Sequence, residues 1–180
     1  MIFKDLLLKN KGAVLDKWLH LILETYPAGT SKFMRQEKDR FINPVGHTLI
    51  ESTEALYEGL LQGMEADQLA GYLERIIQIR STQDFSPSQA VVIIPALKMA
   101  LREEMKRSGI EIHHVMEEWF AFASRIDQLS LVAFDIYTKY REKIYEIRIN
   151  EIKKERDRAF KLLERTHSIE KHRDPETSSG

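Results

Sequence analysis

The stretch that decides the fold reads IIQIRSTQDFSPSQAVVIIPALKM and covers residues 76–99. Within it, Ser86 has the chemistry of a helix N-cap, and Pro87 suits the first helical position. Gln89 stands three residues after the cap, where a capping box requires Glu or Gln. The five residues that follow, AVVII, make every face of a helix apolar. Because such a helix must be buried, we expect a central helix that begins at Ser86.

Pro95 lies inside this helix, which the apolar pattern extends over residues 86–107. A proline in a helix interior removes one backbone hydrogen bond and bends the helix axis. The bend could line a ligand cavity, or it could follow a curved core. The sequence leaves both interpretations open, and Pro95 is therefore a candidate site residue.

Apolar residues recur at helical spacing through most of the remaining chain. Residues 2–9 form a short apolar start, whereas residues 30–40 are polar and suit either a short helix or a loop. Alternation with a period of two, which is typical of half-buried strands, is nowhere sustained. The sequence therefore predicts an all-α fold. The longer predicted helices cover residues 14–26, 43–63, 66–80, 86–107 and 111–166.

The helix after residue 43 begins with the same order of cap and proline, Asn43 followed by Pro44. Gly46 lies in its first turn, where the missing side chain would allow another helix to cross closely. Gly63 has the position of a helix C-cap. These residues are predicted to define the two ends of this helix.

The composition excludes several functional classes. The chain has 180 residues, of which 43% are hydrophobic and 31% charged, as in a globular helical domain. It contains no cysteine, which excludes disulfides, thiolate metal sites and cysteine nucleophiles. A net charge of −1 provides no general attraction to nucleic acid or anionic lipid. We therefore expect no nucleic-acid partner.

The hydrophobic segments are too short for a membrane protein. A membrane-spanning helix needs about 20 consecutive apolar residues, and no run of that length occurs. The first residues, MIFKD, also lack the pattern of a signal peptide. We expect a cytoplasmic protein without a membrane span.

Two pairs of residues have the spacing of a metal site. Glu111 and His114, like Glu164 and His167, stand three residues apart, as in di-iron carboxylate bundles. Such a site also needs inward glutamates from two other helices, and none is evident. Surface pairs explain the spacing better, and we expect no bound metal.

Four histidines could in principle bind a haem iron, namely His20, His47, His113 and His114. Haem is therefore an open alternative, although we expect no cofactor. The sequence contains no P-loop, glycine-rich dinucleotide turn or nucleophile elbow. It therefore gives no indication of an enzyme.

A polar cluster precedes the cap at Ser86. It consists of Arg80, Gln83 and Asp84. The cluster could recognise an anion, or its hydrogen bonds could hold the connection between two helices. The second role is the simpler expectation.

The C-terminal helix changes character after Tyr140. Its apolar positions follow a 4-3-4-3-4 spacing, which indicates a coiled-coil seam with one charged interruption. We expect three parts: a helical domain over residues 1–140, a projecting dimerisation helix over 141–167, and a disordered tail over 168–180. The seam consists of Tyr145, Ile149, Ile152, Arg156, Ala159 and Leu163.

Two segments resemble a known family. Residues 40–46, RFINPVG, resemble its R-F-x-N-P-x-G segment, and residues 79–90, IRSTQDFSPSQA, resemble its I-R-x-x-Q-x-F-x-P-S-x-A segment. The family is the RsbRD-type N-terminal domain, the sensor-like part of RsbT co-antagonist proteins. Each segment alone is also ordinary helix-cap sequence, but their order and separation make the joint match more specific. The similarity extends from about Leu6 to Ile136.

The resemblance implies a globin-like helical bundle that works without haem and forms a dimer. In longer members of the family, a C-terminal helix connects this domain to an output domain such as STAS or a histidine kinase. This chain stops after its helix, so the resemblance predicts a stand-alone input domain. The residues that would form its ligand pocket or structural signature are Asn43, Pro44, Gly46, Arg80, Gln83, Ser86, Pro87 and Pro95.

We expect a non-enzymatic sensor or adaptor that forms a homodimer and docks an unidentified regulatory protein. A ligand or partner would shift the packing around the 86–107 helix, and the 111–166 helix would transmit the change. Three alternatives stay open: a haem or apolar-ligand carrier, a carboxylate-bridged metal protein, and a simple scaffold. The dimer helix would use Tyr145, Ile149, Ile152, Ala159 and Leu163.

Overall fold

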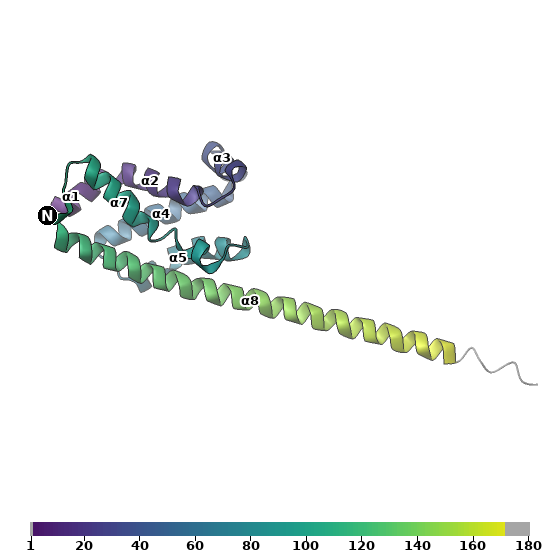
Figure 1. Ribbon diagram of the computed structural model, residues 1–180. Helices are drawn as coiled ribbons and strands as arrows, with labels where there is room; N and C mark the ends of the chain where they lie inside the picture. The colour runs from purple at the N-terminus through teal and green to yellow at the C-terminus, as the bar shows by residue number, and fades with distance from the viewer. Residues whose placement is uncertain (1, 172–180) are drawn as a thin grey trace, which may run out of the picture. The chain divides into compact units, whose positions relative to one another are not determined.

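The computed structural model describes residues 2–171, and all regular structure in this range is helical (Figure 1). The prediction of an all-α fold with a long C-terminal helix is therefore confirmed. The elements in chain order are α1 (Ile2–Lys9), α2 (Lys11–Leu23), α3 (Ala28–Gln36), α4 (Pro44–Gln62), α5 (Ala66–Thr82), α6 (Pro87–Val91), α7 (Ala96–Arg107), the 3-10 helix η1 (Ile112–His114) and α8 (Met116–Lys171).

The chain divides into two structural units at a boundary within α8, after Tyr140. The first unit contains α1 to α7, η1 and the beginning of α8, and the second contains the rest of α8. Of the tail that we expected to be disordered, residues 168–171 belong to α8. Residues 172–180 lie outside the described part of the chain.

The first unit is built around α2 and α4. α2 packs against α7 and α4, and α4 packs against α5 (Figure 1). Each helix buries an apolar stripe against its neighbours, and this burial is the main force that holds the unit together. The largest apolar side chains that are fully buried are Trp18, Tyr57, Leu7, Ile22, Leu49, Leu56, Leu60, Leu69, Leu73, Ile76 and Ile77.

Buried aromatic side chains also connect the helices through hydrogen bonds to backbone carbonyls. A buried indole N–H or phenol O–H needs an acceptor, because an unpaired polar group in the core costs free energy. The carbonyls that serve as acceptors lie near helix ends, where helix geometry leaves such groups without partners. The pairs are Trp18 with Ile93 at 2.7 Å, Tyr57 with Leu7 at 3.0 Å and Tyr137 with Phe85 at 2.5 Å.

The segment that we predicted as one bent helix, residues 86–107, forms two helices instead. α6 ends at Val91, turn residues 92–95 follow, and α7 begins directly after Pro95. Pro95 has no N–H, and immediately before a helix the missing donor costs little. The Val91 carbonyl accepts the N–H of Ile94 at 3.0 Å and so closes a tighter turn. The proline therefore separates two helices rather than bending one.

The predicted start of α6 is confirmed. Ser86 Oγ accepts the N–H of Gln89 at 3.3 Å, and Gln89 Oε1 accepts the N–H of Ser86 at 3.0 Å, which completes the capping box. Pro87 occupies the first helical position. The predicted end of α4 is confirmed as well, because Gly63 has a left-handed backbone with φ of 80°.

Asn43 joins α3 to α4. Its Oδ1 accepts the N–H of Gly46 at 2.9 Å, as an N-cap does. Its Nδ2 donates to the carbonyls of Met34 and Glu37 at 3.0 and 3.1 Å. A Cβ atom on Gly46 would overlap this side-chain amide. Gly46 therefore makes room for the cap and not, as we expected, for a crossing helix.

Replacing Gly46 with Ala should destabilise the protein by about 1–3 kcal/mol, because the new methyl group displaces the Asn43 cap. Gly71 in α5 is the matched control, since a Cβ there meets no atom within 4 Å. Gly71→Ala should stabilise by about 0.5–1 kcal/mol through helix propensity. Urea unfolding of both variants measures the two changes, and a destabilised Gly71→Ala or an unchanged Gly46→Ala would contradict this account.

Candidate functional site

Arg80 of α5 is a charged residue in the core. The exposed fraction of its side chain is 0%. Its Nη2 donates to Thr25 Oγ1 at 2.9 Å and to the carbonyl of Gln89 at 2.8 Å. Thr25 follows α2, and Gln89 belongs to α6, so one guanidinium ties three helices together. From the sequence we expected the cluster that contains Arg80 to hold the connection between two helices by hydrogen bonds. The bonds of Arg80 to Thr25 and Gln89 connect α5 to the end of α2 and to α6.

Two aromatic rings enclose the same guanidinium. Its Cζ atom lies 3.9 Å from the ring centre of Phe85 and 5.1 Å from that of Tyr26. Cation–π contacts of this kind gain strength when water is excluded. The two rings also contact each other edge to face, with their centres 5.2 Å apart. The two rings therefore stabilise the positive charge of Arg80 in place of the water that would surround it at the surface.

The buried charge is incompletely paired. Arg80 Nε and Nη1 and the hydroxyl of Tyr26 have no hydrogen-bond partner among the residues that the structure describes. Burial lowers the pKa of Arg80, and Tyr26 opposes this change. Burial likewise raises the pKa of Tyr26, and the positive charge of Arg80 opposes that rise. Arg80 nevertheless stays protonated, because a guanidinium is too strong a base to lose its proton inside a protein.

Replacing Arg80 with Lys should destabilise the protein by about 2 kcal/mol. The compact ammonium group cannot reach both acceptors and stack on Phe85 at the same time. Arg75 of the same helix is the control, because it is exposed and has an ion pair with Glu51 at 3.2 Å. Arg75→Lys should change the free energy of unfolding by less than about 0.5 kcal/mol. Equal losses in the two variants would show that burial of Arg80 has no special role.

The other predicted site residues lie at the ends of four helices. Asn43, Pro44 and Gly46 form the start of α4, far along the chain from the Arg80 contacts. Gln83 is the C-cap of α5, and its side chain is exposed. The exposed Ser86 and Pro87 start α6, and Pro95 precedes α7.

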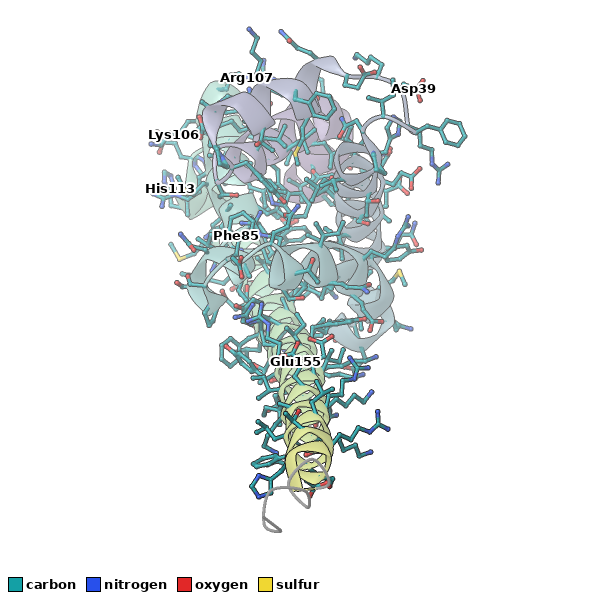
Figure 2. All side chains as sticks on the ribbon, turned by 90° about the vertical axis from the view of Figure 1, so that its right-hand side faces the viewer. Asp39, Phe85, Lys106, Arg107, His113 and Glu155 are labelled. Atoms are coloured by element: carbon teal, nitrogen blue, oxygen red, sulfur yellow. The ribbon has the colours of Figure 1, made fainter. Side chains whose placement is uncertain are left out.

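The loop before α4 presents an apolar side chain to solvent. Phe41 is 95% exposed, although the backbone around it is well fixed. The N–H of Phe41 donates to Asp39 Oδ1 at 2.8 Å, and the N–H of Asp39 donates to Glu37 Oε1 at 2.8 Å. Figure 2 labels Asp39 at the edge of the first unit. The fold therefore does not need the ring of Phe41 for its core.

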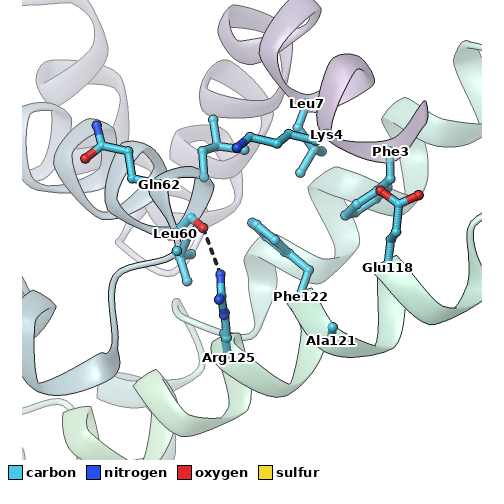
Figure 3. A pocket seen from close by; sticks show the side chains of 11 residues that line it. Phe3, Lys4, Leu7, Leu60, Gln62, Glu118, Ala121, Phe122 and Arg125 are labelled. Carbon is cyan, nitrogen blue, oxygen red and sulfur yellow. Dashed lines mark hydrogen bonds between the residues drawn. The ribbon is translucent and has the colours of Figure 1, made fainter. Parts of the chain in front are cut away.

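A pocket opens between α1, the end of α4 and the first part of α8 (Figure 3). Its volume is about 280 Å³. Its apolar walls include Phe3, Leu7 and Phe122, which are 1–8% exposed. The rings of Phe3 and Phe122 meet edge to face, with their centres 5.7 Å apart. This arrangement suits a ligand with an apolar part.

Charged side chains stand around the same pocket. They belong to Lys4, Glu118 and Arg125. Arg125 Nη1 donates to the carbonyl of Leu60 at 3.3 Å, at the C-terminal end of α4. No sequence pattern predicted this site, because its residues are distant in the chain and each has an ordinary helix pattern. The only local signal was the spacing of Phe122 and Arg125, which places both on one face of α8.

The histidines do not assemble a metal centre in the described part of the chain, where no group of three or more His, Asp or Glu side chains is close enough. His20 contacts Glu24 at 2.9 Å. Glu111 contacts His113 at 3.1 Å and not His114, which the sequence pattern had suggested. The three pockets described in the first unit have no histidine in their walls.

The second unit presents the predicted seam to solvent. Tyr145 is 49% exposed, Ile149 51%, Ile152 64% and Leu163 66%. Figure 2 shows side chains on every side of α8 around Glu155. Arg156, the charged interruption, pairs with Asp157 at 2.9 Å. An apolar row of this length on one helix is a surface that favours association.

One of the comparisons with known proteins identifies a family. Residues 12–152 match the model of the family described as "RsbT co-antagonist protein rsbRD N-terminal domain". A protein of Archaeoglobus fulgidus, described as uncharacterized, is 21% identical over 156 residues, which cover 86% of this chain and 93% of that protein. No solved structure matches. Within residues 2–171, no helix has both the length and the apolar character needed to cross a membrane.

Proposed function

Because the chain belongs to the RsbT co-antagonist protein rsbRD N-terminal domain family, we propose that it is a regulatory input domain that signals through a homodimer. In this proposal it has no catalytic function and acts in the cytoplasm. The first unit receives the signal, and the second unit forms the dimer and docks a regulatory protein. A globin-like arrangement of the first unit is part of the same proposal.

The exposed seam of α8 is the observation that carries this proposal. Its positions follow the spacing at which two α-helices bury apolar residues against each other. In water, the half-exposed side chains of Tyr145, Ile149 and Ile152 leave apolar surface uncovered. Covering apolar surface stabilises by about 25 cal/mol per Å². A second copy of the helix supplies a surface of matching spacing.

The continuity of α8 provides the route for a signal. The helix is unbroken from Met116 to Lys171. Its first turns contribute Trp119, Phe122 and Ile126 to the core of the first unit. A change in the packing of these side chains shifts or rotates the helix, and two packed helices respond to such a change by adopting a different contact geometry. In this proposal the two α8 helices of the dimer pack in either of two geometries, and the signal determines which geometry is adopted.

Two isoleucines provide a matched test of the seam. Ile147 and Ile149 are each 51% exposed, but only Ile149 occupies a seam position. Ile149→Glu should weaken dimerisation by about 100-fold, because it places charge at the centre of the helix contact. Ile147→Glu should leave the dimer intact. Sedimentation equilibrium of both variants measures the dissociation constants.

The stronger form of this test replaces Tyr145, Ile149 and Ile152 together with Glu. The triple variant should be monomeric by light scattering and should keep a folded first unit by circular dichroism. A dimer that survives the triple substitution, or one that responds equally to changes at Ile147 and Ile149, would rule out the seam.

A second candidate function is the binding of an apolar ligand. The observation that favours it is the pocket between α1, α4 and α8, with its aromatic walls. The two functions are compatible, since Phe122 and Arg125 of α8 line the pocket. An occupant would then be the signal that the domain receives.

A further inference from the structure

We propose that the pocket lined by Phe3, Phe122 and Arg125 binds a small carboxylic acid with a short apolar tail. This inference rests on the proposed sensor function, because it identifies the chemical class of the signal. The carboxylate would lie at Arg125, and the tail would lie against the two rings. We refer to this site as the α1–α8 pocket.

The apolar part of the α1–α8 pocket is prepared for a ligand. Phe3 and Phe122 are held in place by their edge-to-face contact, and Phe3 also contacts Trp119, with ring centres 6.2 Å apart. Small-molecule sites typically combine apolar and aromatic walls with a few polar groups. Rigid rings lose little conformational entropy when a ligand arrives, so the site requires little reorganisation.

Arg125 is the group that selects a carboxylate. A guanidinium has five N–H donors, and among the described residues Arg125 uses one of them, in the 3.3 Å bond to the Leu60 carbonyl. It has no ion pair with a described carboxylate. Its remaining donors can bind both oxygens of a carboxylate, which is the geometry that arginine favours. Lys4 adds a second positive charge to the lining.

The same arginine has a structural role that does not account for the pocket. A cation near the end of α4 stabilises the partial negative charge of the helix C-terminus. One hydrogen bond to the Leu60 carbonyl is enough for that role. The aromatic hollow beside Arg125 contributes nothing to capping the helix.

The charges also determine the orientation of the ligand. Figure 3 shows Arg125 beside Leu60 at one end of the α1–α8 pocket and Glu118 beside Phe3 at the other, with Phe122 between them. Glu118 repels an anion, so the carboxylate must face Arg125. The apolar tail then extends across Phe122 toward Phe3.

The volume limits the size of the acid. A space of about 280 Å³ is at the small end of the range for ligand pockets. At about 30 Å³ for each group the size of a water molecule, it accommodates roughly nine non-hydrogen atoms. Hexanoate, which has eight, is therefore a suitable probe. A long-chain fatty acid is too large to be enclosed.

Titration of the 180-residue protein with hexanoate, followed by NMR or calorimetry, tests the inference directly. We expect saturable binding with a dissociation constant of about 0.1–1 mM. Pentylamine and 1-pentanol have the same five-carbon tail without the carboxylate, and they should bind at least 10-fold more weakly. Absence of saturation by hexanoate at about 10 mM, or equal binding of the three probes, would overturn the proposal.

Variants then locate the site. Arg125→Gln should weaken hexanoate binding at least 10-fold. Arg102 of α7 lines a different pocket and is the control, so Arg102→Gln should not change hexanoate binding. Ala121→Phe serves as a second variant, because Ala121 is an exposed residue at the pocket and its replacement fills the space without removing a core contact. Binding that survives both Arg125→Gln and Ala121→Phe would place the acid elsewhere and overturn the assignment.

This experiment is separable from the test of the dimer. If hexanoate binding depends on Arg125 but Ile149→Glu leaves dimerisation unchanged, the α1–α8 pocket is supported and the seam is rejected. A dimer that depends on Ile149 in a protein that does not bind hexanoate would reject the site alone.

Discussion

The buried positive charge of Arg80 is the constraint on which the arrangement of the first unit depends. Removing a guanidinium from water is costly, and the loss is offset only if acceptors and rings replace the water. Thr25, Gln89 and the rings of Tyr26 and Phe85 provide these contacts from two parts of the chain, residues 25–26 and 85–89. The end of α2 and the whole of α6 therefore cannot move independently of α5.

α8 differs from this rigid centre in the kind of contacts it makes. Within the first unit it adds apolar side chains to the core, and two hydrogen bonds connect it to helix ends: Arg125 to the end of α4, and Tyr137 to the connection between α5 and α6. In the proposed function, the helices held by Arg80 form the fixed frame, and α8 is the element that moves in response to a signal.

Sequence patterns predicted the features that depend on neighbours in the chain. The capping box at Ser86, the cap at Asn43 and the turn at Gly63 involve residues within a few positions, so their chemistry was visible. The pattern could not show whether Pro95 bends a helix or divides it, because Trp18, whose indole binds the Ile93 carbonyl, is 75 residues away. The α1–α8 pocket was hidden for the same reason, since its walls come from three distant segments.

The two tryptophans give the protein a built-in optical readout of these two regions. Trp18 is 1% exposed beside the break between α6 and α7, and Trp119 is 8% exposed beside Phe3 at the edge of the α1–α8 pocket. Indole emission shifts to longer wavelength when water reaches the ring. Because the chain contains no third tryptophan, replacing either one with Phe assigns the remaining emission to a single region. The surroundings of Trp18 and of Trp119 can thus be followed separately, in two unlabelled variants that each keep a single tryptophan.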